Sequence, residues 1–140
     1  MTSRAKSHYA AVAMLELAVR AEEPQPISVR DIAAEHDVPL AFLNQIFQQL
    51  KVAGLVTSVR GSAGGYRLKR SASMITLAEI VEAVSPNMRT PSPTPRSLVN
   101  QVLEQTWEEL EQANHDRLDA LRLDQLVQEV TRSQEGMFYI

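Results

Sequence analysis

Apolar residues recur every three or four positions through the first part of the chain, and this pattern predicts three helices. The first helix is rich in Ala, covers residues 5–20 and ends before a proline-containing turn at residues 24–26. The second helix is short and covers residues 28–34. It opens with Ser28 and Asp31, which we interpret as a variant of the capping box.

The third helix is predicted to begin at Pro39, because proline already has the backbone angle of a first helical position. Gly54 marks its end, since glycine readily adopts the left-handed conformation that closes a helix. The apolar side chains expected to face the core are Leu43, Ile46, Phe47 and Leu50. The opposite side is then uncharged and rich in amides, with Ala41, Gln45 and Gln48 at its centre and Asn44 and Gln49 beside them.

After the third helix the period changes, and two β-prone runs follow at residues 55–60 and 66–69. The glycine-rich segment 61–65 lies between them, so the two runs are predicted to form a hairpin with a flexible tip. A capping box that starts at Thr76 then opens a further helix. Three helices followed by a hairpin are typical of a winged helix-turn-helix domain, which we assign to residues 1–85.

The rest of the chain is predicted to be a linker and a helical dimerisation region. Prolines among Ser and Thr mark residues 86–96 as the linker, and residues 97–140 form the helical region. A long helix is expected at residues 97–121 and a short one at residues 124–131. The fold class is therefore mainly α with a small β wing.

The long helix has an apolar stripe made of Val99, Leu103, Trp107, Leu110, Leu118 and Leu121. A helix of this length extends about 37 Å, which is more than a small domain covers. We therefore expect the stripe to pack against a second copy in a homodimer. The alternative is that the helix folds back on its own domain.

Charge is distributed unevenly along the 140 residues, whose net charge is −3. Residues 1–70 hold nine Lys or Arg and six Asp or Glu, a net charge of +3, so residues 71–140 carry −6. A basic half beside an acidic half fits a DNA-binding domain joined to a part that avoids DNA.

Composition excludes several classes of protein. The chain has no cysteine, and so no disulfides, thiolate metal sites or cysteine nucleophiles. No apolar run approaches the roughly 18 residues that a membrane span needs. The first residues lead into a helical pattern rather than a signal peptide. We therefore expect a cytoplasmic protein that does not associate with a membrane.

The outward face of the third helix has the chemistry to read DNA bases. Asn and Gln pair bidentately with adenine, and small apolar groups contact the thymine methyl. The alternative is that these amides only solvate a surface helix. Arg60 precedes the hairpin glycines, and a narrow tip that carries Arg is suited to insertion into a DNA minor groove. The alternative is an ordinary solvated hairpin. The candidate DNA-binding residues are Lys6, Ala41, Asn44, Gln45, Gln48, Arg60, Gly61, Gly64, Gly65, Arg67 and Lys69.

Several short motifs are those of a known family. They are Tyr9-Ala10, Asp31-Ile32-Ala33, Phe42-Leu43-Asn44-Gln45-Ile46, Gly54-Leu55-Val56, Val59-Arg60-Gly61 and Gly64-Gly65-Tyr66. Because of these motifs, residues 5–85 resemble the Rrf-type (IscR/NsrR/CymR-like) winged-helix transcriptional regulators. Asn44 is a departure, because the family usually has Glu there. The resemblance implies that the third helix enters the major groove, that Arg60 enters the minor groove and that the long helix builds a homodimer.

The same resemblance raises the question of an iron-sulfur cluster. Many members hold one on three cysteines near the start of the long helix, and Glu104, three residues before Trp107, replaces the family's cluster histidine. Because thiolates hold such clusters, we expect no cluster and no other cofactor. We interpret the lone His8 as a phosphate or helix contact. His36 and His115 have no second ligand at metal spacing in the sequence, so no metal site is expected.

Together these features predict a sequence-specific DNA-binding transcriptional regulator. We expect a homodimeric repressor on a palindromic operator in double-stranded DNA, with a small molecule or a partner protein as effector where it has one. The alternative is a winged-helix module whose main partner is another protein, with the apolar tail at residues 137–140 as one docking element. An enzyme is not expected, because no Ser/His/Asp arrangement, paired carboxylates or phosphate loop is present.

Overall fold

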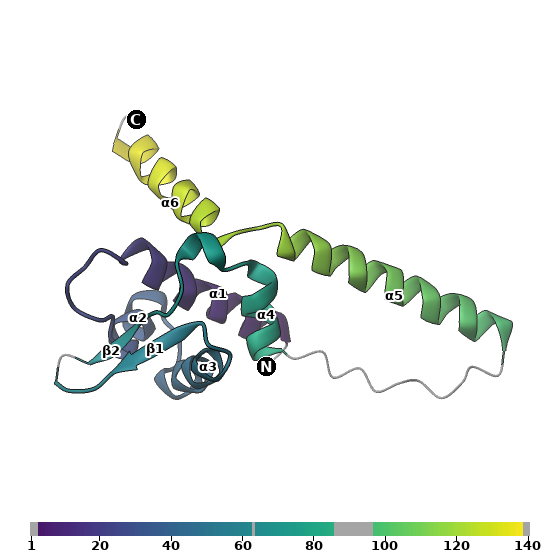
Figure 1. The fold of residues 1–140 in the computed structure, drawn as a ribbon, viewed down its shortest axis with the longest axis horizontal. Coiled ribbons are helices and arrows are strands. Elements are labelled where there is room, and N and C mark those ends of the chain that lie inside the picture. The colour runs from purple at the N-terminus through teal and green to yellow at the C-terminus, as the bar shows by residue number, and fades with distance from the viewer. Residues whose placement is uncertain (1–2, 63, 86–96, 139–140) are drawn as a thin grey trace.

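The chain forms a winged-helix body from which two further helices extend (Figure 1). The computed structural model describes residues 3–62, 64–85 and 97–138. In chain order the elements are α1 (Ser3–Val19), α2 (Val29–His36), α3 (Leu40–Val52), β1 (Val56–Val59), β2 (Gly65–Leu68), the 3-10 turn η1 (Ala72–Met74), α4 (Leu77–Val84), α5 (Leu98–Asp119) and α6 (Leu123–Phe138). The predicted fold class, mainly α with a small β wing, is confirmed. The predicted linker at residues 86–96 and the end of the apolar tail at residues 139–140 lie outside the described residues.

The core of the body lies between α1, α3 and the wing. α1 contributes small and unbranched side chains, among them Ala13 and Met14, so that α3 can approach it closely. The stripe predicted for α3 is confirmed, because Leu43, Ile46, Phe47 and Leu50 are all buried. The ring of Phe47 also stacks on Tyr66 of β2 with ring centroids 4.5 Å apart. This contact fixes the wing to α3.

The helix-turn-helix consists of α2, a short turn and α3. The predicted capping by Ser28 is wrong: Ser28 occupies the N-cap position of α2, but its side chain makes no capping hydrogen bond. In a capping box the side chain of Glu or Gln at the third helical position bonds back to the N–H of the N-cap residue, and the shorter Asp31 is less able to form this second, reinforcing bond. α2 ends at His36, and its C-cap residue Asp37 has φ 53°. α3 begins directly after Pro39, which is its N-cap residue.

The predicted stop at Gly54 is confirmed. Gly54 has φ +79°, a left-handed conformation that favours glycine. Its N–H donates to the carbonyl of Lys51 and the N–H of Leu55 donates to the carbonyl of Leu50, both at 3.0 Å. These two bonds are those of a Schellman motif, which turns the chain from α3 into β1.

The wing is a two-stranded antiparallel hairpin with a third segment bridged to it. β1 and β2 pair with Val59 opposite Gly65. On the other side of β2, Ile27 and Tyr66 exchange both backbone hydrogen bonds, at 3.0 and 2.9 Å. A Cβ on Gly65 would lie 2.2 Å from the carbonyl oxygen of Ile27. Gly65 is therefore required because two backbones meet there.

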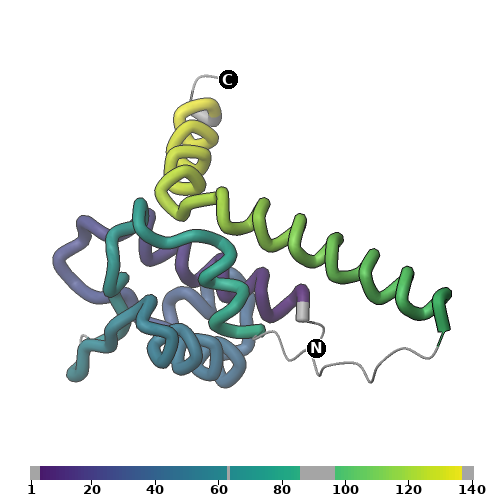
Figure 2. Tube along the Cα trace, turned by 45° about the vertical axis from the view of Figure 1, so that its right-hand side comes forward, coloured from purple at the N-terminus to yellow at the C-terminus, as the bar shows by residue number. Residues whose placement is uncertain are grey.

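α4 and α5 differ sharply in their surroundings. The capping box predicted for α4 is confirmed, since the Thr76 hydroxyl accepts from the Glu79 N–H and the Glu79 carboxylate accepts from the Thr76 N–H. α5, in contrast, has no buried residue and runs outward from the body in both views (Figures 1 and 2).

None of the described helices combines the length and the apolar character that a membrane crossing requires.

α6 returns to the body and joins its core. Leu123, its first residue, is fully buried there, and its N–H donates to the carbonyl of Ile75 at 2.9 Å. The N–H of Leu77 donates in turn to the carbonyl of Leu121 at 2.9 Å. The helix predicted at residues 124–131 is too short, because the apolar pattern ends there while strong helix formers such as Arg, Gln and Glu continue the helix without burial.

Candidate nucleic-acid interface

The outward face of α3 is a row of uncharged polar groups. The four predicted contact residues on this helix, Ala41, Asn44, Gln45 and Gln48, are exposed. The helix has no acidic residue that would repel a polyanion. Gln49 is different: it is half-buried, and its Oε1 is buried without a hydrogen-bond partner among the described residues. The face open to a ligand therefore consists of three amides and one methyl group.

The first turn of α3 leaves backbone donors open. No side chain supplies a capping hydrogen bond there, because Pro39 occupies the N-cap position. The first N–H groups of a helix have no partner within the helix and carry the positive end of its dipole. A phosphate group is stabilised at such a position.

The wing tip is narrow and carries an unengaged cation. Arg60, directly after β1, is exposed and makes no hydrogen bond or ion pair with any residue that the structure describes. Gly61 has φ +118°, and the N–H of Gly64 donates to its carbonyl at 3.0 Å. A Cβ on Gly64 would lie 2.5 Å from the carbonyl of Val59. The two glycines therefore keep the tip thin enough to approach another molecule closely.

The other basic candidates have different surroundings. The guanidinium of Arg67 donates to the carbonyl oxygens of Glu23, at 3.2 Å, and Pro24. Arg67 thus ties β2 to the turn after α1. Lys69 is exposed on the wing, and Lys6 is half-buried on α1. Of the predicted cations, Arg60 and Lys69 are therefore open on the wing, and Arg67 is engaged.

α3 and the hairpin lie on one side of the body, while α6 projects from the opposite side in both views (Figures 1 and 2). The amide face and the wing therefore belong to one region of the surface. Amides that suit base edges, a cation on a thin tip and an open helix N-terminus are together suited to binding a double helix.

The apolar stripe of α5 is uncovered in the single chain. The exposed fractions of its predicted residues are 73% for Val99, 49% for Leu103, 55% for Trp107, 56% for Leu110 and 42% for Leu121, and Leu118 is half-buried. Two further exposed apolar residues, Leu98 and Val102, were missed by the sequence analysis. The alternative that this helix folds back on its own domain is wrong, because no residue of α5 is buried.

His36 has ligand-type neighbours in space that its spacing in the sequence does not reveal. Its Nε2 lies 3.0 Å from Oε2 of Glu16, and Glu35 is close to both. No sequence signal could have revealed this group, since Glu16 lies 20 positions away and only the packing of α2 on α1 brings it to His36.

Comparisons with known proteins agree with this geometry. The family model described as "Rrf2: Iron-dependent Transcriptional regulator" matches residues 3–129. The HTH-type transcriptional regulator IscR of Xenorhabdus nematophila is 42% identical over 84 residues, which are 60% of this chain and 51% of that protein. The corresponding protein of Escherichia coli is 40% identical over the same length. The chain thus aligns with about half the length of these curated relatives.

Solved structures extend the similarity beyond the winged-helix body. The T. potens IscR structure has a TM-score of 0.76 and 29% identity, and the alignment covers 92% of this chain and 88% of that one. CymR, the global cysteine regulator of B. subtilis, has a TM-score of 0.73 and 29% identity, with 89% and 94% of the two chains covered. Both alignments reach past the 84 residues matched in sequence, so the helices after the wing are shared as well.

The description of the family as iron-dependent raises the question of which donors this chain offers to iron. Iron-sulfur clusters are held by thiolates, and this chain has no cysteine. By the resemblance described in the sequence analysis, Glu104 would take the place of the family's cluster histidine and offer a carboxylate instead. The residues present therefore do not fit such a cluster.

The relatives named above are regulators of transcription and not enzymes. The match covers residues 3–129, from the start of α1 into α6. The chain belongs to the Rrf2 family of transcriptional regulators.

Proposed function

We propose that this chain is a homodimeric transcriptional repressor that binds a palindromic operator in double-stranded DNA. The observation that carries the proposal is that the exposed amide face belongs to α3, which lies on the same side of the body as the hairpin, and that the exposed Arg60 directly follows β1 of this hairpin. The first feature reads bases in a major groove, and the second suits the negative potential of a minor groove.

Within α3 we assign direct readout to the amides. Gln45 lies at the centre of the outward face, with Asn44 and Gln48 beside it, and each can donate and accept at an adenine edge. The methyl group of Ala41 can contact a thymine methyl. Since none of these side chains is required for the core, substitutions here are expected to change the preferred sequence while the fold is kept.

On the wing we assign minor-groove contact to Arg60, with Gly61 and Gly64 allowing close approach. Gly65 is left out of the proposed contacts, because the carbonyl of Ile27 already occupies the space beside it. Lys69 and Lys6 are assigned to phosphates, which position the protein without reading sequence. Arg67 is left out of the proposed contacts, because carbonyl groups of the same chain already engage its guanidinium.

For the dimer we assign α5 as the interface. Its stripe leaves large apolar side chains in water, Trp107 among them at 55% exposure, and burial against a second copy would remove this cost. A two-fold dimer presents two α3 helices and so reads two half-sites, spaced by about 10 base pairs or a multiple. Residues 1–85 would then read DNA, residues 86–96 would connect, and residues 97–140 would hold the dimer.

Repression follows from occupancy, because a protein bound at a promoter excludes polymerase from the same DNA. A regulator of bacterial chromosomal DNA works in the cytoplasm, where we place this chain. Its effector would be a small molecule or a partner protein.

The test of this function is selection of bound sites from a random duplex library by the full chain. The expected result is one enriched palindrome, and a promoter carrying it should be repressed in a reporter strain. Recovery of no motif, together with binding that is insensitive to salt, would contradict the proposal and favour a protein partner instead.

The roles of individual residues can be separated by titrating the selected duplex and a scrambled one at several salt concentrations. Gln45→Ala should cost about 1–3 kcal/mol on the selected duplex and relax one position per half-site. Arg60→Ala should weaken binding most on sites with a narrow minor groove. Lys69→Ala, the matched control, should weaken both duplexes alike and reduce the salt slope by about one. Unchanged discrimination by Gln45→Ala and Arg60→Ala would show that other residues read the sequence.

A further inference from the structure

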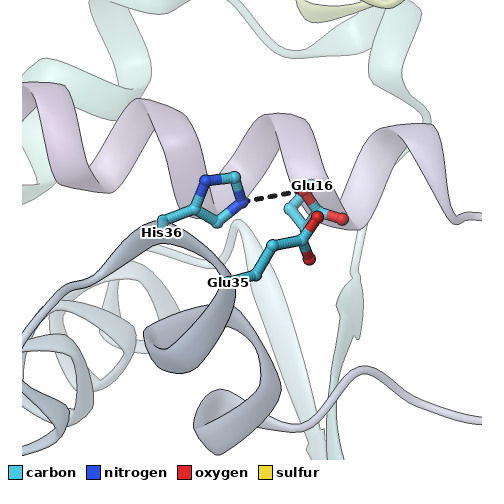
Figure 3. Close-up of side chains that lie close together, drawn as sticks. All are labelled: Glu16, Glu35 and His36. Carbon is cyan, nitrogen blue, oxygen red and sulfur yellow. Dashed lines mark hydrogen bonds and ion pairs between the residues drawn. The ribbon is translucent and has the colours of Figure 1, made fainter.

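Three potential metal ligands converge where the C-terminal end of α2 meets the last turn of α1 (Figure 3). They are Glu16 of α1 and the adjacent Glu35 and His36 of α2, and their ligand atoms all lie within 4.8 Å of one another. In the close-up, the three side chains point toward one another across the gap between the two helices. The group combines one imidazole with two carboxylates and lies apart from the amide face of α3.

The separations within this group suit a shared cation. Two ligands at about 2.1 Å from one ion lie about 3.0–3.4 Å apart for bond angles between 90° and 109°. Nε2 of His36 and Oε2 of Glu16 are already 3.0 Å apart. The Glu35 carboxylate is exposed, so it can close the remaining distance by a change of rotamer.

Among the described residues, Arg20 only partly balances the charge of the group. Nε and one terminal nitrogen of the Arg20 guanidinium donate to Glu23, at 3.1 and 3.0 Å. Its other terminal nitrogen is 3.9 Å from Glu16, without a hydrogen bond. The hydrogen bond to Glu23 is the main reason that the pKa of Arg20 is raised, with smaller contributions from the charges of Glu16 and Glu35.

Glu35 is the least engaged of the three ligands, because its carboxylate makes no hydrogen bond or ion pair with any residue that the structure describes. Glu16 is held in place, with a side chain only 16% exposed and His36 against it. The C-terminal end of α2 adds the negative end of a helix dipole, which favours a cation. The group therefore has one fixed carboxylate, one positioned imidazole and one carboxylate without a partner.

We propose that Glu16, Glu35 and His36 bind one divalent first-row transition-metal ion per chain, with water completing its coordination. The imidazole favours Zn²⁺ or Fe²⁺ over Mg²⁺ and Ca²⁺, which prefer oxygen ligands alone, and the two carboxylates also suit Mn²⁺. The ion takes the place of any proton on Nε2 of His36, the ring keeps its proton on Nδ1, and the ion links α1 to the end of α2. This site contains no thiolate, so it differs from the cysteine site that holds the cluster in other members of the family.

The position of the site gives the ion a structural consequence. His36 is the last residue of α2, and only residues 37–39 separate it from α3. An ion that fixes the end of α2 on α1 therefore also restrains the turn that aims α3. Any effect on operator affinity rests on the proposed function, whereas binding of the ion does not.

The test is calorimetric titration of the full chain, freed of metal with a chelator, with ZnCl₂ and separately with MnCl₂, in the absence of DNA. We expect about one ion per chain, and a melting temperature that rises with the concentration of the ion. His36→Gln and Glu35→Gln should each weaken binding more than about tenfold. The matched controls His115→Gln and Glu22→Gln change exposed residues outside the group and should bind as the wild type does.

Glu35→Gln keeps this test independent of folding, because the Glu35 side chain has no hydrogen bond or ion pair with a described residue to lose. The metal-free melting temperature of this variant should therefore be close to that of the wild type. No binding of either ion up to about 1 mM would overturn the proposal. Binding that survives both His36→Gln and Glu35→Gln but is lost in His115→Gln would also overturn it. Because no DNA is present, these outcomes leave the proposed operator binding untouched, and failure to bind DNA would leave the metal site untouched.

Discussion

Replacing Leu123 by Ala tests whether α6 is part of the winged-helix core. Leu123 is fully buried, and its N–H is bonded to Ile75 of the body. Removing a buried Leu side chain costs its transfer free energy and leaves a cavity, together about 2–5 kcal/mol. We therefore expect Leu123→Ala to lower the free energy of unfolding by an amount in this range.

The expected change in melting temperature follows from the length of the chain. Unfolding entropy is about 2.1 cal/mol/K per residue, or about 0.3 kcal/mol/K for a chain of this size. A loss of about 3 kcal/mol then lowers the melting temperature by about 10 °C. The assay is thermal and urea unfolding followed by circular dichroism, at one fixed protein concentration because a dimer's stability depends on concentration.

The matched control for this experiment is Val52→Ala, which removes apolar atoms at a site that is 89% exposed. It should change stability by less than about 0.5 kcal/mol. If Leu123→Ala behaved like Val52→Ala, α6 would not be packed on the body, and the reasoning from burial would be refuted.

Three further predictions concern the dimer, the wing and iron. Trp107→Ala should weaken the dimer in sedimentation experiments, and a wild-type chain that is monomeric at micromolar concentration would contradict the assigned interface. Gly65→Ala should destabilise the fold by about 1–3 kcal/mol in urea unfolding, because the added Cβ would meet Ile27 and break the paired hydrogen bonds. The control Gly136→Ala should not destabilise the fold, because the Cβ added there has no atom within 4 Å. Anaerobic reconstitution with iron and sulfide should give no visible absorption band of an iron-sulfur cluster, because the chain has no thiolates. A stable chromophore with stoichiometric iron would show that other ligands suffice to hold a cluster.

The elements that could be predicted from the sequence are those encoded by local patterns. The stripe from Leu43 to Leu50 has the helical period and faces the core, and the Thr76 capping box is a short-range signal that the structure reproduces. The turn at Gly54 is of the same kind, because its left-handed conformation is a local preference of glycine. For these residues the tertiary structure agrees with the local preference.

The features that escaped prediction depend on residues far apart in sequence. Leu123 lies between the two helices predicted at residues 97–121 and 124–131, and no local pattern shows that it packs in the core. Arg67 reads as one of several wing cations, yet the carbonyls that engage it follow α1, more than 40 positions earlier. The group around His36 arises in the same way, from two helices whose packing no local pattern specifies.

The docking of Leu123 also bears on how a signal would reach DNA in the proposed dimer. Leu121 and Leu123 bracket the junction between α5 and α6, and both are bonded by their backbones to the segment from Ile75 to Leu77. Leu123 lies in the same core as the buried stripe of α3. The end of α5 is thus anchored to the unit that carries α3, and the distance between two α3 helices is set by how the two α5 helices cross. An effector that shifts this crossing would move each body as a unit and so change the half-site spacing. An ion bound at His36 would instead act within one body, on the turn before α3. The two modes differ in a measurable way: the first changes the preferred spacer length in selected operators, and the second changes affinity at a fixed spacer.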